Sequence, residues 1–176
     1  MILARHPDVR FFIVGEGELQ SALQQQARAL NLGERLVFSG FMRDVAAALS
    51  ALDVVVFPSL WEGTPLTVFE ALAMGKPIVA TDADGLLDVL TDRVDSLIVP
   101  KADAATLADA VCYVLERPSV AADLGESARK TGQRYDIAAF VRKMERLYEL
   151  LHETSRATRR AGILKADLSF LTTERR

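Results

Sequence analysis

The sequence has few residues of the kinds that bind metals or form covalent cross-links. Its 176 residues include one cysteine and two histidines. Cys112 has no partner for an internal disulfide bond, and its apolar neighbours predict a buried thiol, which suits a reducing compartment. The two histidines, His6 and His152, stand far apart, and the nearest approach to a paired-carboxylate motif is Asp82 and Asp84. We therefore expect no metal and no other cofactor.

Long apolar runs and an excess of positive charge are also missing. No run approaches the roughly 18 apolar residues of a membrane span, and residues 1–3 are too short for the core of a signal peptide. The net charge of -3 disfavours nucleic acid as a partner, because phosphate binding usually requires a basic face. These absences predict a cytoplasmic protein and leave a peripheral association with a membrane open.

What the sequence does contain is an alternation of short apolar runs with longer amphipathic segments. Strands are expected at 11–14, 36–38, 53–57, 77–80 and 96–99, and helices at 19–30, 45–52, 65–74, 104–116 and 137–153. Apolar strands that alternate with helices predict an α/β fold, with a Rossmann-like parallel sheet flanked by helices on both faces. The first strand, 11–14, is expected to be buried.

The two ends of the sequence differ from this pattern. Residues 1–7 resemble the last turn of a helix, so we expect one domain, 1–153, whose first elements are truncated. Residues 154–176 form a tail that is either helical or disordered.

Two predicted loops lie where ligands bind open parallel sheets, beyond the carboxyl ends of the strands. The first is Gly15-Glu16-Gly17-Glu18, whose glycines allow a tight turn and a close approach of a ligand. It begins like the dinucleotide fingerprint G-x-G-x-x-G, but Gln20 stands at the third glycine. A plain strand-to-helix turn is the alternative interpretation.

The second loop is more specific, and leads from the third predicted strand into a helix. It reads Pro58-Ser59-Leu60-Trp61-Glu62-Gly63-Thr64-Pro65-Leu66-Thr67-Val68-Phe69-Glu70-Ala71-Leu72-Ala73-Met74-Gly75-Lys76-Pro77. Free N–H groups at the start of this helix would bind a phosphate. Taken singly, Glu62 and Glu70 could be ordinary surface carboxylates. As a pair they could serve a glycosidase, but that reaction has no phosphate to bind.

This loop resembles the hallmark of glycosyltransferase family 4, which has the GT-B fold. Glu62 and Glu70 match the E-x7-E signature of that family, and ordered matches extend from about residue 5 to residue 150. The resemblance implies that the chain is the C-terminal, donor-binding half of a retaining enzyme. Such an enzyme transfers a hexose from a nucleotide-sugar to a glycan or lipid acceptor. A non-catalytic nucleotide-sugar-binding module that acts with a separate acceptor-domain chain is the alternative, and an epimerase of the same fold is disfavoured by the signature.

The resemblance also implies a role for each matching position. Glu70 would accept hydrogen bonds from the ribose of the donor, and Glu62 would contact the donor sugar at the reacting centre. The diphosphate would be bound by backbone N–H groups along Gly63, Thr64, Pro65, Leu66 and Thr67, in which Pro65 itself has no N–H. Gly15 would let the donor approach, and the backbone near Phe41 and Met42 would meet the base.

Departures from the family pattern fall after the fourth and before the fifth predicted strand. Asp84-Gly85-Leu86-Leu87-Asp88 stands where Gly-Gly-x-x-Glu is usual, and Asp95-Ser96 stands where a glycine is usual. The basic residues that neutralise the diphosphate in the family precede the matched region, as does the acceptor domain. Lys76 is expected to be exposed to solvent rather than to replace them.

Overall fold

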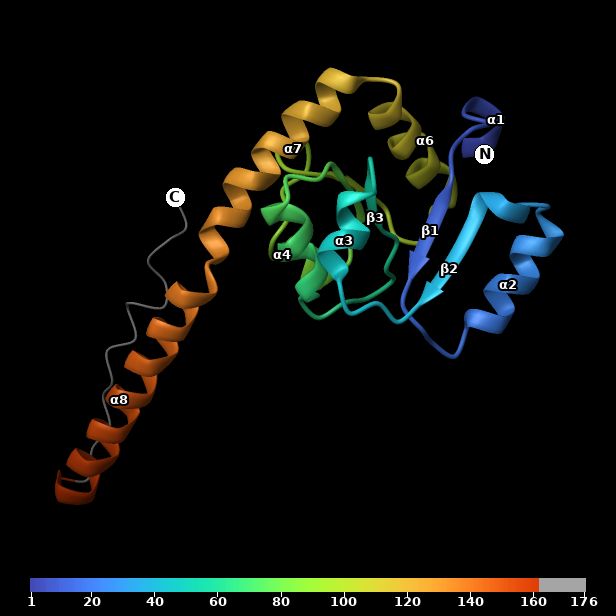
Figure 1. The fold of residues 1–176 in the computed structure, drawn as a ribbon. Helices are drawn as coiled ribbons and strands as arrows, with labels where there is room; N and C mark the ends of the chain where they lie inside the picture. Colours follow the sequence, from blue (N-terminus) through green and yellow to red (C-terminus); the bar gives the residue numbers. More distant parts are fainter. Residues whose placement is uncertain (162–176) are drawn as a thin grey trace. The chain divides into compact units, whose positions relative to one another are not determined.

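The computed structural model of the protein describes residues 1–161 (Figure 1). The chain divides into two compact units, one spanning Met1–Gln133 and one that begins at Arg134. The first unit contains the strands and the candidate site. Residues 162–176, which include most of the tail predicted to be helical or disordered, lie outside the described residues.

Strands and helices alternate through the first unit. In chain order they are α1 (Ile2–Arg5), β1 (Phe11–Val14), α2 (Gln20–Ala29), η1 (Gly33–Arg35), β2 (Leu36–Gly40), α3 (Val45–Ser50), β3 (Val55–Phe57), α4 (Leu66–Ala73), β4 (Ile78–Thr81), α5 (Asp84–Leu87), β5 (Leu97–Val99), α6 (Ala104–Leu115) and α7 (Pro118–Gly132). All the predicted strands and helices of this unit are present, with ends that differ by a few residues. The predicted α/β fold is therefore confirmed.

The five strands are parallel but form two hydrogen-bonded groups instead of the single sheet that we expected. β1 pairs with β2, and β4 pairs with β3 on one side and with β5 on the other. No ladder joins β1 to β3 among the described residues. The truncation of the first elements stays a prediction.

β4 is the centre of the hydrophobic core, because both of its faces are covered. Successive side chains of a strand point to opposite faces. Ile78 and Ala80 belong to the cluster that α4 completes with Val68 and Leu72, whereas Val79 packs against side chains of α6 and α7. All four residues of β4 are buried. The carboxyl end of β4 is thus fixed by packing on both sides.

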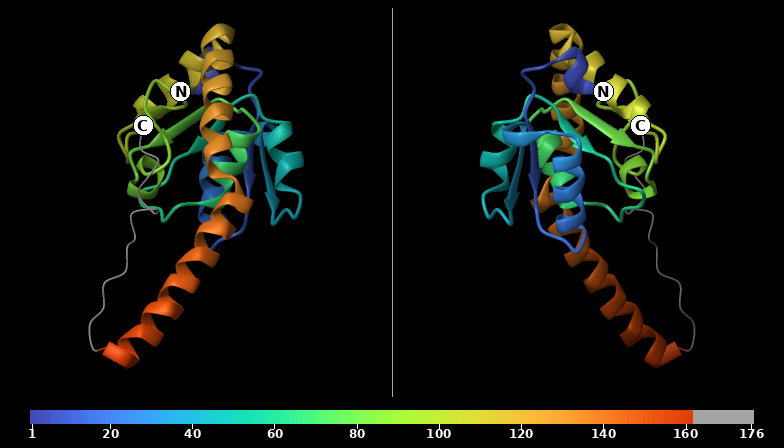
Figure 2. Two further views of the ribbon diagram at one scale, coloured as in Figure 1. Left: turned by 90° about the vertical axis from the view of Figure 1, so that its left-hand side faces the viewer. Right: turned by 90° about the vertical axis from the view of Figure 1, so that its right-hand side faces the viewer.

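α7 lies against α4 (Figures 1 and 2). Their contact depends on small residues. A Cβ atom added to Gly125 would lie 2.5 Å from the carbonyl oxygen of Gly75, and one added to Gly132 would lie 2.8 Å from the amide nitrogen of Ala73. Gly75 follows α4 with a φ of 64°, and the guanidinium of Arg129 donates to the carbonyl of Met74. Residues of α7 therefore fix the C-terminal end of α4.

The prediction that the first strand is buried was wrong. None of the residues of β1 is buried, and Ile13 and Val14 are 38% and 39% exposed. The helix that follows, α2, likewise buries no residue. The apolar sequence of β1 is that of a core strand, but only one of its two edges is paired in the described structure.

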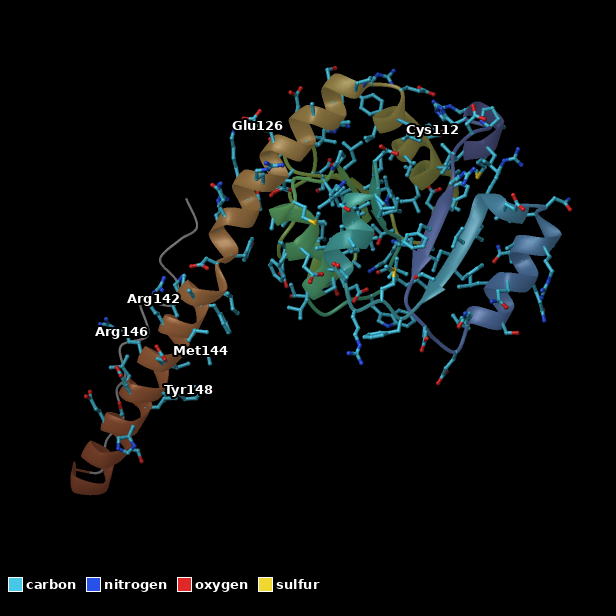
Figure 3. The ribbon with its side chains drawn as sticks, viewed as in Figure 1. Cys112, Glu126, Arg142, Met144, Arg146 and Tyr148 are labelled. Atoms are coloured by element: carbon cyan, nitrogen blue, oxygen red, sulfur yellow. The ribbon has the colours of Figure 1, made fainter. Side chains whose placement is uncertain are left out.

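The boundary between the two units falls within η2 (Gln133–Tyr135), and the second unit contains the long helix α8 (Ile137–Ala161). α8 continues through the predicted domain boundary at 153 without a break. It is amphipathic: Arg142 and Arg146 lie on one side of it, and Met144 and Tyr148 on another (Figure 3). Within the described residues, no helix is long and apolar enough to span a bilayer.

Candidate functional site

The start of α4 is a helix end without a side-chain cap. Pro65 is its N-cap residue, and no side chain bonds to the end. The N–H of Val68 donates to the carbonyl of Pro65, but the N–H groups of Leu66 and Thr67 have no carbonyl one turn earlier to accept from them. Thr64, Leu66 and Thr67 are exposed. This end therefore offers donors and a positive dipole end to an anion.

The loop between β3 and α4 is fixed at Glu62. One carboxylate oxygen of Glu62 accepts a hydrogen bond of 2.8 Å from the hydroxyl of Ser59. The backbone carbonyl of Glu62 accepts from the amide of Gly85, at 3.3 Å. The hydroxyl of Thr81, at the end of β4, donates to the carbonyl of Ser59. Both the backbone and the side chain of Glu62 are thus set by their neighbours.

Gly85 is the closest of these neighbours. A Cβ atom at this position would lie 1.6 Å from the carbonyl oxygen of Gly63 and 2.6 Å from that of Glu62. Only glycine allows the start of α5 to approach the loop so closely. Asp84, which departs from the family pattern, is exposed and does not make this close contact. The glycine that contacts the loop is therefore retained, and the sequence reasoning did not assign it this role.

Glu70 lies on the exposed face of α4. Its neighbours Val68, Ala71 and Leu72 are buried in the core, whereas Glu70 is exposed, at the fifth residue of the helix. Loop and helix follow β3 without interruption, so the structure places Glu62, Glu70 and the uncapped helix end on one strand–loop–helix unit. The loop begins at the carboxyl end of β3, and this is the edge at which open α/β sheets bind ligands.

Gly15 follows β1, the first strand of the other sheet. It is exposed, and its φ of 120° is one that residues with a side chain rarely adopt. Its amide donates to the carbonyl of Gly40 at 2.9 Å, which joins the ends of β1 and β2. Two carboxylates, Glu16 and Glu18, stand just before α2, so a diphosphate at that helix start would meet negative charge. This disfavours the dinucleotide interpretation of the glycine pair.

The prediction that Lys76 is exposed to solvent was wrong. Its side chain is half-buried, and its ammonium donates to the carbonyls of Ser50 and Leu52 at 2.9 and 2.7 Å. These carbonyls are at the end of α3, where a cation is stabilised by the helix dipole. Lys76 therefore stabilises the C-terminal end of α3.

The acidic residues around β4 and β5 also have structural partners. Asp82 accepts from the amide of Lys101 at 2.7 Å. Asp95, 2% exposed, accepts from the amide of Thr91 and from the hydroxyl of Thr131, each at 2.8 Å. Asp95, one of the departures from the family pattern, thereby joins α7 to the turn before β5. No cluster of three metal-binding side chains occurs in the part of the chain that the structure describes.

Comparisons with known proteins identify the family of the chain. Residues 1–117 match the family model described as glycosyl transferases group 1. The chain belongs to this family. It is 31% identical, over 143 residues, to the UDP-Gal:alpha-D-GlcNAc-diphosphoundecaprenol alpha-1,3-galactosyltransferase of Escherichia coli, covering 81% of this chain and 37% of that enzyme. The chain thus spans little more than a third of that relative, and the same share of the putative glycosyltransferase EpsD of Bacillus subtilis.

Solved structures support the same fold. Sucrose-phosphate synthase from Thermosynechococcus elongatus superposes with a TM-score of 0.79 and 29% identity, over 86% of this chain and 41% of that one. HepE of Anabaena, in complex with UDP and glucose, gives a TM-score of 0.78 and 26% identity, over 84% and 42% of the two chains. The described fold is accordingly the Rossmann-like C-terminal domain of a GT-B type glycosyltransferase.

Proposed function

We propose that the chain is the donor-binding part of a retaining glycosyltransferase of family 4, which transfers a hexose from a nucleotide-sugar to a glycan or lipid acceptor. The observation that carries this proposal is the uncapped start of α4 between Glu62 and Glu70. The N–H groups of Leu66 and Thr67 would bind the diphosphate, and the helix end would stabilise the charge that develops on it as it leaves. No metal is needed for this role.

The two glutamates would bind the two ends of the donor. Glu70, exposed on α4, would accept hydrogen bonds from the ribose, and Glu62 would contact the sugar from the fixed loop. The E. coli relative is named for a UDP-galactose donor and a lipid-diphosphate acceptor, and HepE was solved with UDP and glucose. These names support a nucleotide-sugar and a glycan or lipid as substrates. A cytoplasmic location, with the acceptor reached at a membrane surface, belongs to the same proposal.

A thermal-shift screen tests the proposal. The chain is mixed with UDP, GDP and ADP and with their hexose conjugates, each with and without EDTA. A ligand present at 100 times its dissociation constant should stabilise the fold by about 2.7 kcal/mol. We expect one base to shift the midpoint most, in EDTA as well as without it. No shift with any nucleotide would contradict the proposal, and a shift abolished by EDTA would contradict its metal-independence.

A further inference from the structure

The carboxyl ends of β1 and β2 are joined by an irregular hydrogen-bond pattern. Ile13 pairs with Phe38, but the next residue, Val14, pairs with Gly40, so Ser39 is an extra residue in β2. The hydroxyl of Ser39 donates to the carbonyl of Gly40 at 2.9 Å. Such bulges bend a strand and redirect the residues that follow it. Here the redirected residues are those that begin the loop at Phe41.

Glu16 connects the two loops that leave these strands. Its Oε1 atom accepts a hydrogen bond of 3.2 Å from the amide of Phe41. Gly40, beside it, has a φ of 68°, and a Cβ atom there would lie 3.2 Å from the same Oε1. Glycine at position 40 therefore allows both the turn and the approach of the carboxylate.

The side chain of Phe41 does not hold its backbone in place. The side chain is 71% exposed, so it is not anchored by burial in a core. The preceding residue is fixed by the amide of Gly15, which donates to the carbonyl of Gly40. The bond from the Phe41 amide to the Glu16 carboxylate, at 3.2 Å between exposed groups, is the next contact along the chain.

We infer that Glu16 is a positioning residue for the nucleotide base. Its carboxylate sets the backbone of Phe41 and Met42, the segment expected to meet the base, and so determines which base is preferred. This inference rests on the proposed function. Glu16 acts through Phe41 rather than by contact with the diphosphate, which a carboxylate would repel.

The test uses the full chain with Glu16→Ala, Glu16→Gln and, as a matched control, Glu18→Ala. Glutamine keeps an oxygen at the Oε1 position, whereas alanine removes it. Amide hydrogen exchange of Phe41, followed by NMR without nucleotide, should become faster in Glu16→Ala alone. Titration with UDP, GDP, ADP and CDP should then show about tenfold weaker binding of the preferred nucleotide in Glu16→Ala, with little change for the others. The difference in affinity between the preferred nucleotide and the others would therefore become smaller in Glu16→Ala. Glu16→Gln would restore much of that difference.

Four results would overturn the inference. Unchanged exchange at Phe41 in Glu16→Ala would show that the carboxylate does not fix this amide. Equal losses for all four nucleotides would show a general structural role without an effect on the base. If the parent chain binds none of the nucleotides, the proposed function fails and the inference fails with it. The inference alone fails if the parent binds a nucleotide and Glu70→Ala weakens it, but Glu16→Ala leaves base preference intact.

Discussion

At the scale of single residues, the two glutamates of the candidate site differ in how they are fixed. Glu62 has a hydrogen-bonded carboxylate and a hydrogen-bonded backbone; the first bond comes from Ser59 of the same loop and the second from Gly85 beside it. Glu70 owes its position to α4 itself, whose opposite face is buried. A substitution at either glutamate should therefore change ligand contacts with little change in the core.

Glu62→Ala should weaken binding of the intact nucleotide-sugar more than binding of the bare nucleoside diphosphate. The lost hydrogen bonds to a charged acceptor are each worth about 1.5–3 kcal/mol, and only the donor with a sugar makes them. Titration calorimetry with both ligands gives the comparison. Ser59→Ala keeps the carboxylate of Glu62 but removes the hydroxyl that orients it. This variant should therefore also lose affinity for the nucleotide-sugar, but by less than Glu62→Ala. Equal losses of the two ligands in Glu62→Ala would refute the assignment.

Gly85→Ala should destabilise the fold and disturb the loop at Glu62 together. The added methyl group would overlap the carbonyl of Gly63, which is backbone and cannot rotate away, and such overpacking costs about 1–3 kcal/mol. Urea unfolding measures the loss. Gly17→Ala is the control, because a Cβ atom there meets nothing within 4 Å. Equal stabilities of the two variants would show that the contact at Gly85 is not as tight as described.

At the scale of elements, α7 forms a structural support behind the site. It packs on α4 through glycines, caps the end of α4 through Arg129, and reaches the turn before β5 through Thr131. α4 carries the candidate phosphate-binding end and Glu70. The position of that end therefore depends on a helix that contributes no residue to the candidate site.

Thr131→Val should lower the free energy of unfolding by about 1.5–3 kcal/mol, because Asp95 would lose one of its donors while its carboxylate stays buried. Thr131→Ser keeps the hydroxyl and should cost less. Urea unfolding of both variants measures the difference. If valine and serine were equivalent, the hydrogen bond to Asp95 would not contribute to stability.

The sequence predicted most elements that are rich in large apolar residues, but it missed the short helix α5 and the longer helix α7. The strands and α2, α3, α4, α6 and α8 follow from apolar periodicity, whereas α7 has few large apolar residues, chiefly Val120 and Leu124. The contact face of α7 is built from Gly125, Ala128 and Gly132, and glycine lowers helix propensity. The site was also predicted only in part. Glu62 and Glu70 follow from a sequence motif, whereas the contacts of Gly85 and Asp95 could not be predicted because they join segments that are distant in sequence.

At the scale of the whole molecule, the chain corresponds to little more than a third of the enzymes it matches. In open sheets of this kind the ligand binds at the carboxyl edge, and under the proposed function the strand–loop–helix segment from β3 to α4 would form part of such a site. The resemblance implies that basic residues which neutralise the diphosphate precede the matched region, and this stays a prediction. Lys76, the nearest lysine after the loop, is engaged by α3.

We expect the purified chain to bind donors weakly and not to transfer sugar. Positioning of donor and acceptor accounts for roughly 7–11 kcal/mol of such a barrier, and the acceptor side is expected from another domain. Donor affinity near millimolar corresponds to about -4 kcal/mol. Donor turnover with a panel of lipid, sugar and protein acceptors measures this. Activity that appears only when an N-terminal domain is added would agree with the account, and robust transfer by the chain alone would contradict it.

The most direct test of the central claim is the affinity of the chain for its preferred nucleoside diphosphate with and without Glu70. Titration calorimetry should give a dissociation constant about ten- to hundredfold higher for Glu70→Ala, because the ribose would lose its charged acceptor. Glu126→Ala removes the same charge from the exposed side of α7, where Glu126 pairs with Lys130, and should match the parent (Figure 3). An unchanged dissociation constant in Glu70→Ala, or equal losses in both variants, would contradict a nucleotide site at the start of α4.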